Sequence, residues 1–246
     1  MKKIAAILIL CCCPILAISS NSGTSLRTAN CQKPLLGDLA KANALPDPIL
    51  RETEKSRLNF YLGRCAFLEE ETDVSVSFFE QGEKNAEAAL GIKADEPIAL
   101  FWWIANKGTL ADISRSVTAL RIIKMIEDKL ILISEKAPDY GYAGAYRVLG
   151  KIYDKAPRFI SIGSSSKAEK YLKKAVEKFP DFPGNIIALA EFYNDDDQKD
   201  EAKKILQPLI QSQQIQKGDY GPFNVEKAEW EQIVKRLTAT WRAKSE

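Results

Sequence analysis

The 246-residue chain contains no histidine. This absence excludes Ser-His-Asp triads, histidine general bases and every zinc site that has a histidine ligand. The sequence also lacks a phosphate-binding glycine loop, a Gly-x-Ser-x-Gly turn and a Cys-x-x-Cys pair. The remaining carboxylates, lysines and tyrosines show no spacing typical of a catalytic site. We therefore expect a protein that is not an enzyme and that uses no cofactor and no metal.

The sequence also lacks an excess of charge of either sign. It has 35 Lys and Arg residues against 33 Asp and Glu residues, and Lys2 and Lys3 account for the whole difference. A neutral chain without a run of basic residues gives no electrostatic footprint for nucleic acid. We expect no nucleic-acid partner.

A long uninterrupted apolar run is missing everywhere except at the N-terminus. There Lys2 and Lys3 precede an apolar stretch that ends in small residues near Ala17 and Ser19. Two charges, an apolar stretch and small residues are typical of a secretory signal. The run is shorter than the roughly 20 residues that span a bilayer. We expect residues 1–19 to be a signal peptide cleaved after Ser19, and the protein to be exported to the periplasm.

Three cysteines inside this segment leave a second interpretation open. Cys11, Cys12 and Cys13 would allow a lipoprotein that is anchored to the membrane through a lipidated cysteine. Lipoprotein signals usually place a small residue before that cysteine, and Leu10 fits this poorly. Simple cleavage is therefore the favoured alternative.

Removal of residues 1–19 leaves two cysteines, Cys31 and Cys65. A pair of cysteines in an oxidising compartment can form a disulfide. The alternative is a free Cys31 in a mobile leader and a buried free Cys65 in a helix. Because sequence separation says nothing about geometry, we favour the free thiols.

The rest of the chain is predicted to be helical. We expect a flexible leader with a short helix over residues 20–48 and one helical domain over residues 49–246, because apolar residues return at spacings of three and four. Prolines and glycines mark the expected boundaries. They predict helices over residues 51–70, 72–90, 97–107 and 110–136. Gly108 is expected to end the third of these helices.

The second half contains an internal repeat. Ala168, Leu172 and Ala175 recur 34 residues later as Ala202, Leu206 and Leu209. The preceding positions Tyr146, Leu149, Gly150 and Tyr153 recur 40 residues later as Ile186, Leu189, Ala190 and Tyr193, with an insertion between Tyr153 and Ala168. A 34-residue period with small residues at fixed places is typical of the tetratricopeptide repeat, a pair of antiparallel helices.

We therefore predict an all-α fold, a tetratricopeptide-like solenoid of helix pairs with a C-terminal closing helix. The closing helix follows Pro222, and Asn224 is its predicted cap. Its apolar face should shield the last repeat from solvent. That face is predicted to contain Trp230, Val234, Leu237 and Trp241.

The segment from Tyr140 to Tyr153, YGYAGAYRVLGKIY, is more particular than a generic repeat. It resembles the segment after the long fourth helix of TatT-type proteins, the tetratricopeptide component associated with bacterial TRAP transporters. Ala99–Trp103, Lys167–Leu172, Gln198–Ala202 and Glu226–Arg236 resemble further family segments in the same order, so the resemblance covers roughly residues 72–236. This sequence departs from the family pattern at its N-terminus, which is shorter than expected and has a poor lipidation signal.

This resemblance implies a periplasmic, all-helical protein. It implies a partner, the solute-binding protein of a TRAP-type uptake system, and a cavity for a hydrophobic small molecule. Since a member of the family is oligomeric, it also admits a homo-oligomer. Tetratricopeptide proteins without a transporter partner share much of the pattern, so a general scaffold for envelope protein–protein interactions is the alternative.

Candidate binding residues follow from repeat position, because the first helix of each pair lines the concave face. These residues are Arg147 and Lys151 in one unit and Glu191 and Asn194 in the next. Arg147, beside Tyr142 and Tyr146, suits an anionic group or an aromatic stack. The alternative for Arg147 is a structural ion pair with an acid on a neighbouring helix. The run Asn194–Asp197 lacks the glycine and the distal glutamate of a calcium loop, so we expect a solvated turn there.

Two further features complete the predicted site. Trp102 and Trp103 are adjacent, so their side chains point about 100° apart on a helix. One of them could line a cavity or an interface, although burial of both is the favoured outcome. Gly141 and Gly144 are expected to permit a turn and close helix contact.

Overall fold

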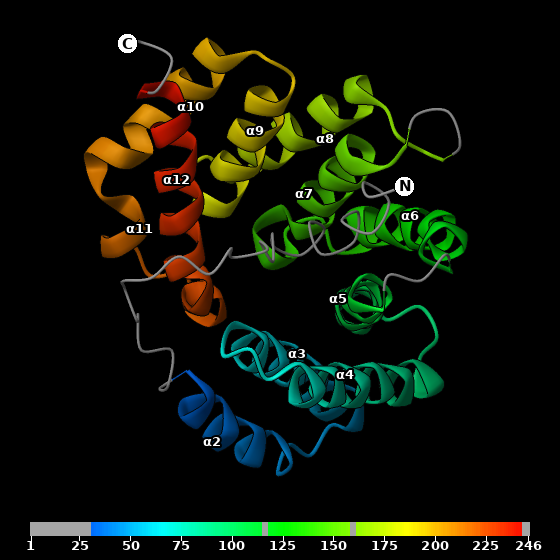
Figure 1. Cartoon of the computed structure of the whole chain (residues 1–246). Helices are drawn as coiled ribbons and strands as arrows, with labels where there is room; N and C mark the ends of the chain where they lie inside the picture. The colour runs from blue at the N-terminus through cyan, green and yellow to red at the C-terminus, as the bar shows by residue number, and fades with distance from the viewer. Residues whose placement is uncertain (1–30, 115–117, 158–160, 243–246) are drawn as a thin grey trace. The chain divides into compact units, whose positions relative to one another are not determined.

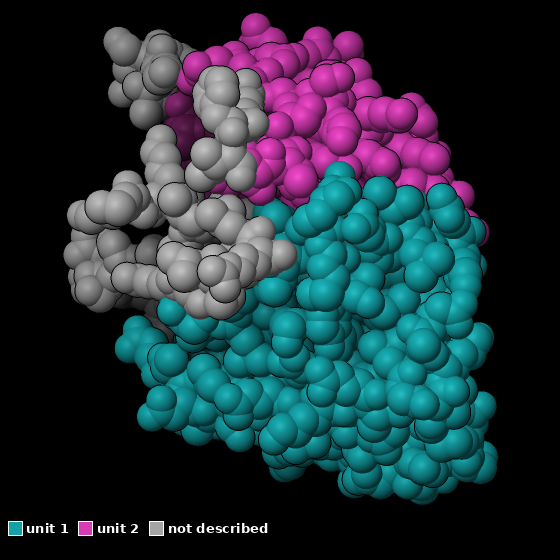
Figure 2. Space-filling model, turned by 90° about the vertical axis from the view of Figure 1, so that its right-hand side faces the viewer, with its two compact units in different colours: residues 1–137 teal, residues 138–246 magenta. Residues whose placement is uncertain are grey.

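A computed structural model describes residues 31–114, 118–157 and 161–242 of the chain. These ranges contain helices and turns and no strand, which confirms the predicted all-α fold. The chain divides into two compact units, residues 1–137 and residues 138–246 (Figure 2). The domain boundaries predicted after residues 19 and 48 remain predictions.

The helices follow one another along the chain and are labelled in Figure 1. In the first unit they are α2 (Gln32–Ala42), α3 (Pro48–Leu68), α4 (Thr72–Ile92), α5 (Pro97–Ile113) and α6 (Thr118–Lys136). In the second unit they are α7 (Tyr140–Lys155), α8 (Ser165–Lys178), α9 (Pro183–Asp195), α10 (Lys199–Ser212), α11 (Gln214–Lys217), the 3₁₀ helix η1 (Gly221–Glu226) and α12 (Lys227–Arg242).

The first unit is built around α3, α4 and α5, which share an aromatic core and a buried polar contact. The Phe60 ring lies 5.8 Å from Phe79 and 5.6 Å from Trp102, so each of the three helices contributes one ring. Close to this core, the Ser56 hydroxyl donates to the Gly82 carbonyl at 2.7 Å, and Asn106 Nδ2 donates to Ser56 Oγ at 3.1 Å. A buried hydrogen-bonded contact of this kind fixes the register of the three helices.

The structure corrects one helix boundary in this unit. We predicted that Gly108 ends a helix and that a second helix runs from 110 to 136. Instead, α5 continues through Gly108 to Ile113, and α6 begins at Thr118. Thr109 and Asp112 in this extension are buried. Tertiary packing of the extra turn outweighs the cost of about 1 kcal/mol for glycine inside a helix.

The prediction of two free thiols was wrong. Cys31 and Cys65 form a disulfide, with their Cα atoms 6.2 Å apart. Cys31 directly precedes α2, and Cys65 lies in the last turn of α3. The bridge therefore ties the first described residues to the core of the first unit.

Membrane-spanning helices are absent from the described part of the chain. No helix in those ranges is both long enough and apolar enough to cross a bilayer. The predicted signal peptide and its three cysteines lie outside the described residues. Export and lipidation therefore stay predictions.

The predicted repeat corresponds to two antiparallel helix pairs, α7 with α8 and α9 with α10. Gly150 shows why a small residue is needed at its position, because a Cβ atom there would lie 2.5 Å from Leu172 Cγ. Ala168 and Ala202, the small residues of the second helices, are fully buried. Small residues therefore recur at these positions because the two helices of each pair pack closely there.

The predicted closing helix is α12, which packs on the last repeat. Trp230, Ile233 and Leu237 are buried in one cluster with residues of α9 and α10, and Val234 and Trp241 are half-buried beside it. The prediction that Asn224 caps this helix was wrong. Asn224 lies inside η1, and its side-chain oxygen accepts from the Tyr220 backbone N–H at 3.0 Å. Asn224 therefore orders the preceding turn and does not cap α12.

Candidate functional site

The first turn of α7 is left-handed. Gly141, Tyr142 and Ala143 have φ values of 61°, 56° and 62°, so three successive residues occupy the left-handed region. Glycine adopts this conformation freely, whereas it costs a residue with a side chain of the order of 1 kcal/mol or more. The turn that we predicted at Gly141 thus includes two residues in an unfavourable conformation. Other contacts must hold this turn in place.

Arg147 and Asn185 supply those contacts. Arg147 Nη1 donates to the carbonyl oxygens of Gly141 and Tyr142 at 3.2 and 3.3 Å, and to Asn185 Oδ1 at 2.8 Å. Asn185 Nδ2 donates to the Tyr142 carbonyl at 3.0 Å and to the Ala175 carbonyl at 2.9 Å. The two side chains join the turn, α8 and α9 at one buried point.

An aromatic cluster covers the outside of this turn. The Tyr142 ring stacks on Phe182, with ring centroids 4.2 Å apart and an interplanar angle of 6°. Phe179, Tyr220 and Phe223 contact the Tyr142 ring edge-on. The Arg147 guanidinium lies over the Phe182 ring at 5.1 Å, so it combines the predicted aromatic stack with hydrogen bonds to carbonyls. Its partner on the next helix is an amide and not an acid.

Lys151, one turn further along α7, faces Glu191 of α9. The Lys151 Nζ atom lies 3.8 Å from a Glu191 carboxylate oxygen, beyond hydrogen-bond distance. Arg236 of α12 donates to the other oxygen of that carboxylate at 2.6 Å. The side chains of Lys151 and Glu191 are about nine-tenths buried. Three helices therefore meet at one carboxylate.

Asn194, near the end of α9, is also in contact with α12. Its side-chain oxygen accepts from the Trp241 indole N–H at 3.0 Å. We refer to Arg147, Lys151, Glu191, Asn194, Arg236 and Trp241 as the inner-face cluster. Within this set, Lys151 and Glu191 meet Arg236, and Asn194 meets Trp241, whereas Arg147 contacts Asn185 and Phe182.

Asp154 and Lys155 lie one turn beyond Lys151 on α7. Burial raises the pKa of the Asp154 carboxyl above its usual range, even though Lys155 Nζ lies 2.7 Å away. Lys155 also pairs with Asp195 at the end of α9. Lys155 therefore pairs with an acid on its own helix and with an acid at the end of α9.

The other predicted site residues lie elsewhere. Tyr146 is buried and stacks on Tyr171 of α8 at 6.2 Å, with Lys174 Nζ 4.4 Å from its ring, so it lies away from Arg147. Trp102 and Trp103 are both buried in the first unit. Trp102 is part of the aromatic core, and Trp103 donates to Glu87 at 3.3 Å with Lys107 and Lys129 over its ring.

Sequence reasoning missed Asn185 and Arg236. Asn185 is completely buried inside the otherwise apolar run that begins α9. A polar residue in such a run signals an internal hydrogen-bond partner, although the sequence does not identify that partner. Arg236 lies on the predicted closing helix, and its contact with Glu191 depends on how α12 crosses α9.

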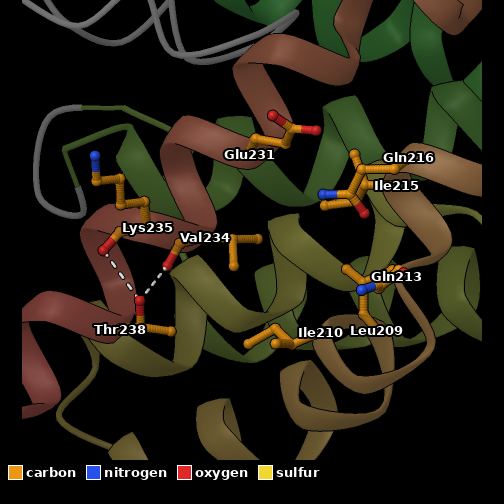
Figure 3. Close-up of a pocket in the computed structure, with 9 residues that line it drawn as sticks. All are labelled: Leu209, Ile210, Gln213, Ile215, Gln216, Glu231, Val234, Lys235 and Thr238. Carbon is orange, nitrogen blue, oxygen red and sulfur yellow. Dashed lines mark hydrogen bonds between the residues drawn. The ribbon is translucent and has the colours of Figure 1, made fainter.

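A separate pocket of about 480 Å³ lies among α10, α11 and α12 (Figure 3). Leu209, Ile210, Ile215 and Val234 form its apolar part, and five polar residues complete the lining. The Thr238 hydroxyl donates back to the carbonyls of Val234 and Lys235. The polar residues are Gln213, Gln216, Glu231, Lys235 and Thr238.

Metal binding has no support in the described ranges of the chain. They contain no group of three or more Cys, Asp or Glu side chains arranged to hold an ion. In the Asn194–Asp197 run, Asp195 pairs with Lys155 and Asp197 pairs with Lys199. These acids therefore take part in ion pairs at the end of the helix pair.

The helix pairs and the closing helix define a helix-pair repeat protein. Residues 163–215, which contain α8, α9 and α10, match the family model for the tetratricopeptide repeat. Residues 163–215 thus form a tetratricopeptide repeat, and domains of this kind generally mediate protein–protein interactions. A comparison with curated proteins finds none that matches the chain.

Proposed function

We propose that this protein is an exported accessory component of a TRAP-type solute uptake system, where it docks a periplasmic solute-binding protein. The observation that carries the proposal is the pair of tetratricopeptide helix pairs, α7–α8 and α9–α10, with charged side chains between their first helices. Such repeats provide a rigid surface for a partner protein. Nothing in this role requires catalysis.

Two observations support export. The N-terminal sequence is typical of a secretory signal. The Cys31–Cys65 disulfide suits an oxidising compartment such as the periplasm. Whether the mature chain is also anchored through a lipid depends on the processing of residues 11–13.

The transporter partner rests on the resemblance of residues 140–153 to TatT-type proteins. In the structure this segment forms the left-handed turn and the first part of α7. The particular residues of the segment, above all Gly141 and Arg147, are the ones that build and hold the turn. A specialised local structure therefore underlies the sequence on which the resemblance depends.

The pocket among α10, α11 and α12 supports a second part of the proposal, that the protein holds a hydrophobic small molecule. Its volume is within the range of small-molecule sites, and four apolar side chains line it. Glu231 and Lys235 at its edge would orient a ligand with a polar end.

Binding to purified solute-binding proteins tests the docking role. The mature chain, residues 20–246, is immobilised and exposed to solute-binding proteins of the source cell's TRAP systems, with solute-binding proteins of unrelated uptake systems as the comparison. We expect specific binding to a TRAP partner. Arg236→Ala on the inner face should weaken it, and Lys170→Ala on the outside of α8 should leave it unchanged. Equal binding to both classes of protein would reject the transporter role.

A general envelope scaffold that recognises a peptide is the second candidate. The observation that favours it is the family match, which describes the repeat and not a transporter component. A genomic neighbourhood without transporter genes would favour this candidate over the first.

A further inference from the structure

Lys151 is a buried cation without a hydrogen bond. Its side chain is 11% exposed, and its nearest acid, Glu191, lies at 3.8 Å. Among the described residues, its ammonium donates no hydrogen bond, and Arg236 donates to the other oxygen of the Glu191 carboxylate at 2.6 Å. Burying a charged group without hydrogen-bond partners is unfavourable. Lys151 is therefore ion-paired with Glu191, while its three N–H donors are not used by any hydrogen bond within the described residues.

Arg147, one turn earlier on α7, has unused donors of its own. All three of its hydrogen bonds within the described chain come from Nη1. Its Nε and Nη2 groups therefore stay available, while the Phe182 ring and the Asn185 amide hold the guanidinium in a fixed orientation. A guanidinium held in this way loses little entropy when it binds a carboxylate.

The two cations act on the same side of α7. Residues four apart lie on one face of a helix, about 6 Å apart at Cβ. Both side chains extend toward α9, since Arg147 reaches Asn185 and Lys151 faces Glu191. An anionic group between them could accept from both at once.

We propose that Arg147 and Lys151 form a binding site for a single carboxylate group of a ligand. Arg147 offers the planar fork that matches a carboxylate, and Lys151 offers a point charge beside it. The carboxylate can belong to a small organic acid or to an acidic side chain of a partner protein. The site goes beyond the proposed docking role and does not depend on a transporter.

The surrounding charges favour a single negative charge. The ion pairs around Lys151 contain three cations and three acids, which balance. Arg147 adds a fourth cation and leaves one positive charge in excess. A carboxylate neutralises that excess, whereas a doubly charged phosphate would exceed it. The cations are Arg147, Lys151, Lys155 and Arg236, and the acids are Asp154, Glu191 and Asp195.

Titration calorimetry at constant ionic strength tests the site with the mature chain. The small-molecule arm uses acetate, succinate and inorganic phosphate. The peptide arm uses a blocked Ala-Glu-Ala tripeptide, with Ala-Gln-Ala as its control. Lys151→Met removes the ammonium and keeps the aliphatic part of the side chain, and Lys170→Met on α8 is the matched control. Arg147→Lys keeps the charge and removes the fork.

We expect a carboxylate ligand to bind the wild-type chain about tenfold to a hundredfold more tightly than the Lys151→Met chain, because a charged hydrogen bond is lost. Arg147→Lys should also weaken binding, and Lys170→Met should not. Binding of the small acids, of the Glu peptide, or of both supports the site and identifies the source of the carboxylate. The site is rejected if no carboxylate binds, if phosphate binds as tightly, or if Lys170→Met has the same effect. Thermal unfolding of each variant shows that it is folded.

Discussion

Asn185 and Arg147 converge on the carbonyl oxygen of Tyr142, which accepts from both side chains at 3.0 and 3.3 Å. They also bond to each other at 2.8 Å. This pair holds two residues with side chains in a left-handed turn, a conformation that neither would adopt by itself at no cost. The stability of the second unit should therefore depend on an asparagine that has no contact with solvent.

Asn185→Ala is expected to destabilise the protein by about 3 kcal/mol, since it leaves buried carbonyls and the Arg147 guanidinium without their partner. Urea unfolding followed by circular dichroism measures the change. Gln232→Ala, on the exposed side of α12, is the control and should change stability by less than about 0.5 kcal/mol. Equal effects of the two substitutions would show that the turn needs no amide.

Gly150→Ala is expected to destabilise the protein by about 1–3 kcal/mol, although alanine is the better helix former. A Cβ atom at this position would meet Leu172 Cγ at 2.5 Å and the Leu172 backbone nitrogen at 3.1 Å. Thermal unfolding provides the measurement. Gly91→Ala, in the last turn of α4, is the matched control because nothing lies within 4 Å of its Cβ position. It should stabilise the protein by up to about 1 kcal/mol, and a stabilising Gly150→Ala would contradict the close packing of α7 on α8.

Reduction of the Cys31–Cys65 disulfide should release α2 from α3. The double substitution Cys31→Ser with Cys65→Ser is expected to cost about 2–4 kcal/mol. Protease digestion should then cut first near residues 43–47, the connection between α2 and α3. Alkylation before and after reduction, read by mass spectrometry, tests the bond directly. Labelling of both cysteines in the untreated native protein would disprove it.

Acid should weaken the first unit through Glu52. Burial by itself would raise the pKa of this carboxyl, but Asn85 at 2.7 Å and Lys55 at 3.1 Å favour the charged form, so its pKa is lowered from 4.5. A carboxyl whose pKa is lower in the folded state stabilises the protein above the unfolded-state pKa. This contribution is lost as the pH falls through the folded-state pKa.

Glu52→Gln therefore tests the acid dependence. The wild-type chain should be more stable than the variant above about pH 5, and the difference should shrink as the pH falls below 4.5. Glu80→Gln, at an exposed position on α4, serves as the control. A difference that stays constant from about pH 3 to about pH 7 would assign the stabilisation to packing and not to charge.

The repeat in the second unit could be predicted from the sequence because its physical cause is local. Gly150 and Leu172 must fit together, and their counterparts in the next helix pair are again a small and a large residue, Ala190 on α9 and Leu206 on α10. The start of α5 at Pro97 was predicted for a similar reason, since proline is favoured in the first turn of a helix. Structural features that are set by one or two residues at a fixed spacing can therefore be predicted from the sequence.

Features that depend on contacts between distant residues could not be predicted. Gly108 suggested the end of a helix, but the packing of the next turn keeps α5 intact. The Cys31–Cys65 bond depends on where α2 crosses α3. The left-handed turn extends past Gly141 into Tyr142 and Ala143 because Arg147 and Asn185 hold the turn's carbonyls, and the role of Asn185 requires α9 to be in place.

The position of α12 limits how this repeat array can grow. In a repeat protein, each added helix pair packs on the face left open by the pair before it. Here Trp230, Ile233 and Leu237 already cover that face of α9 and α10. A helix pair added after α10 would have to displace α12. A helix pair inserted before Pro183 would instead pack on α7 and α8 on one side and on α9 and α10 on the other. Lengthened versions of this protein should therefore carry their extra repeats upstream of α9.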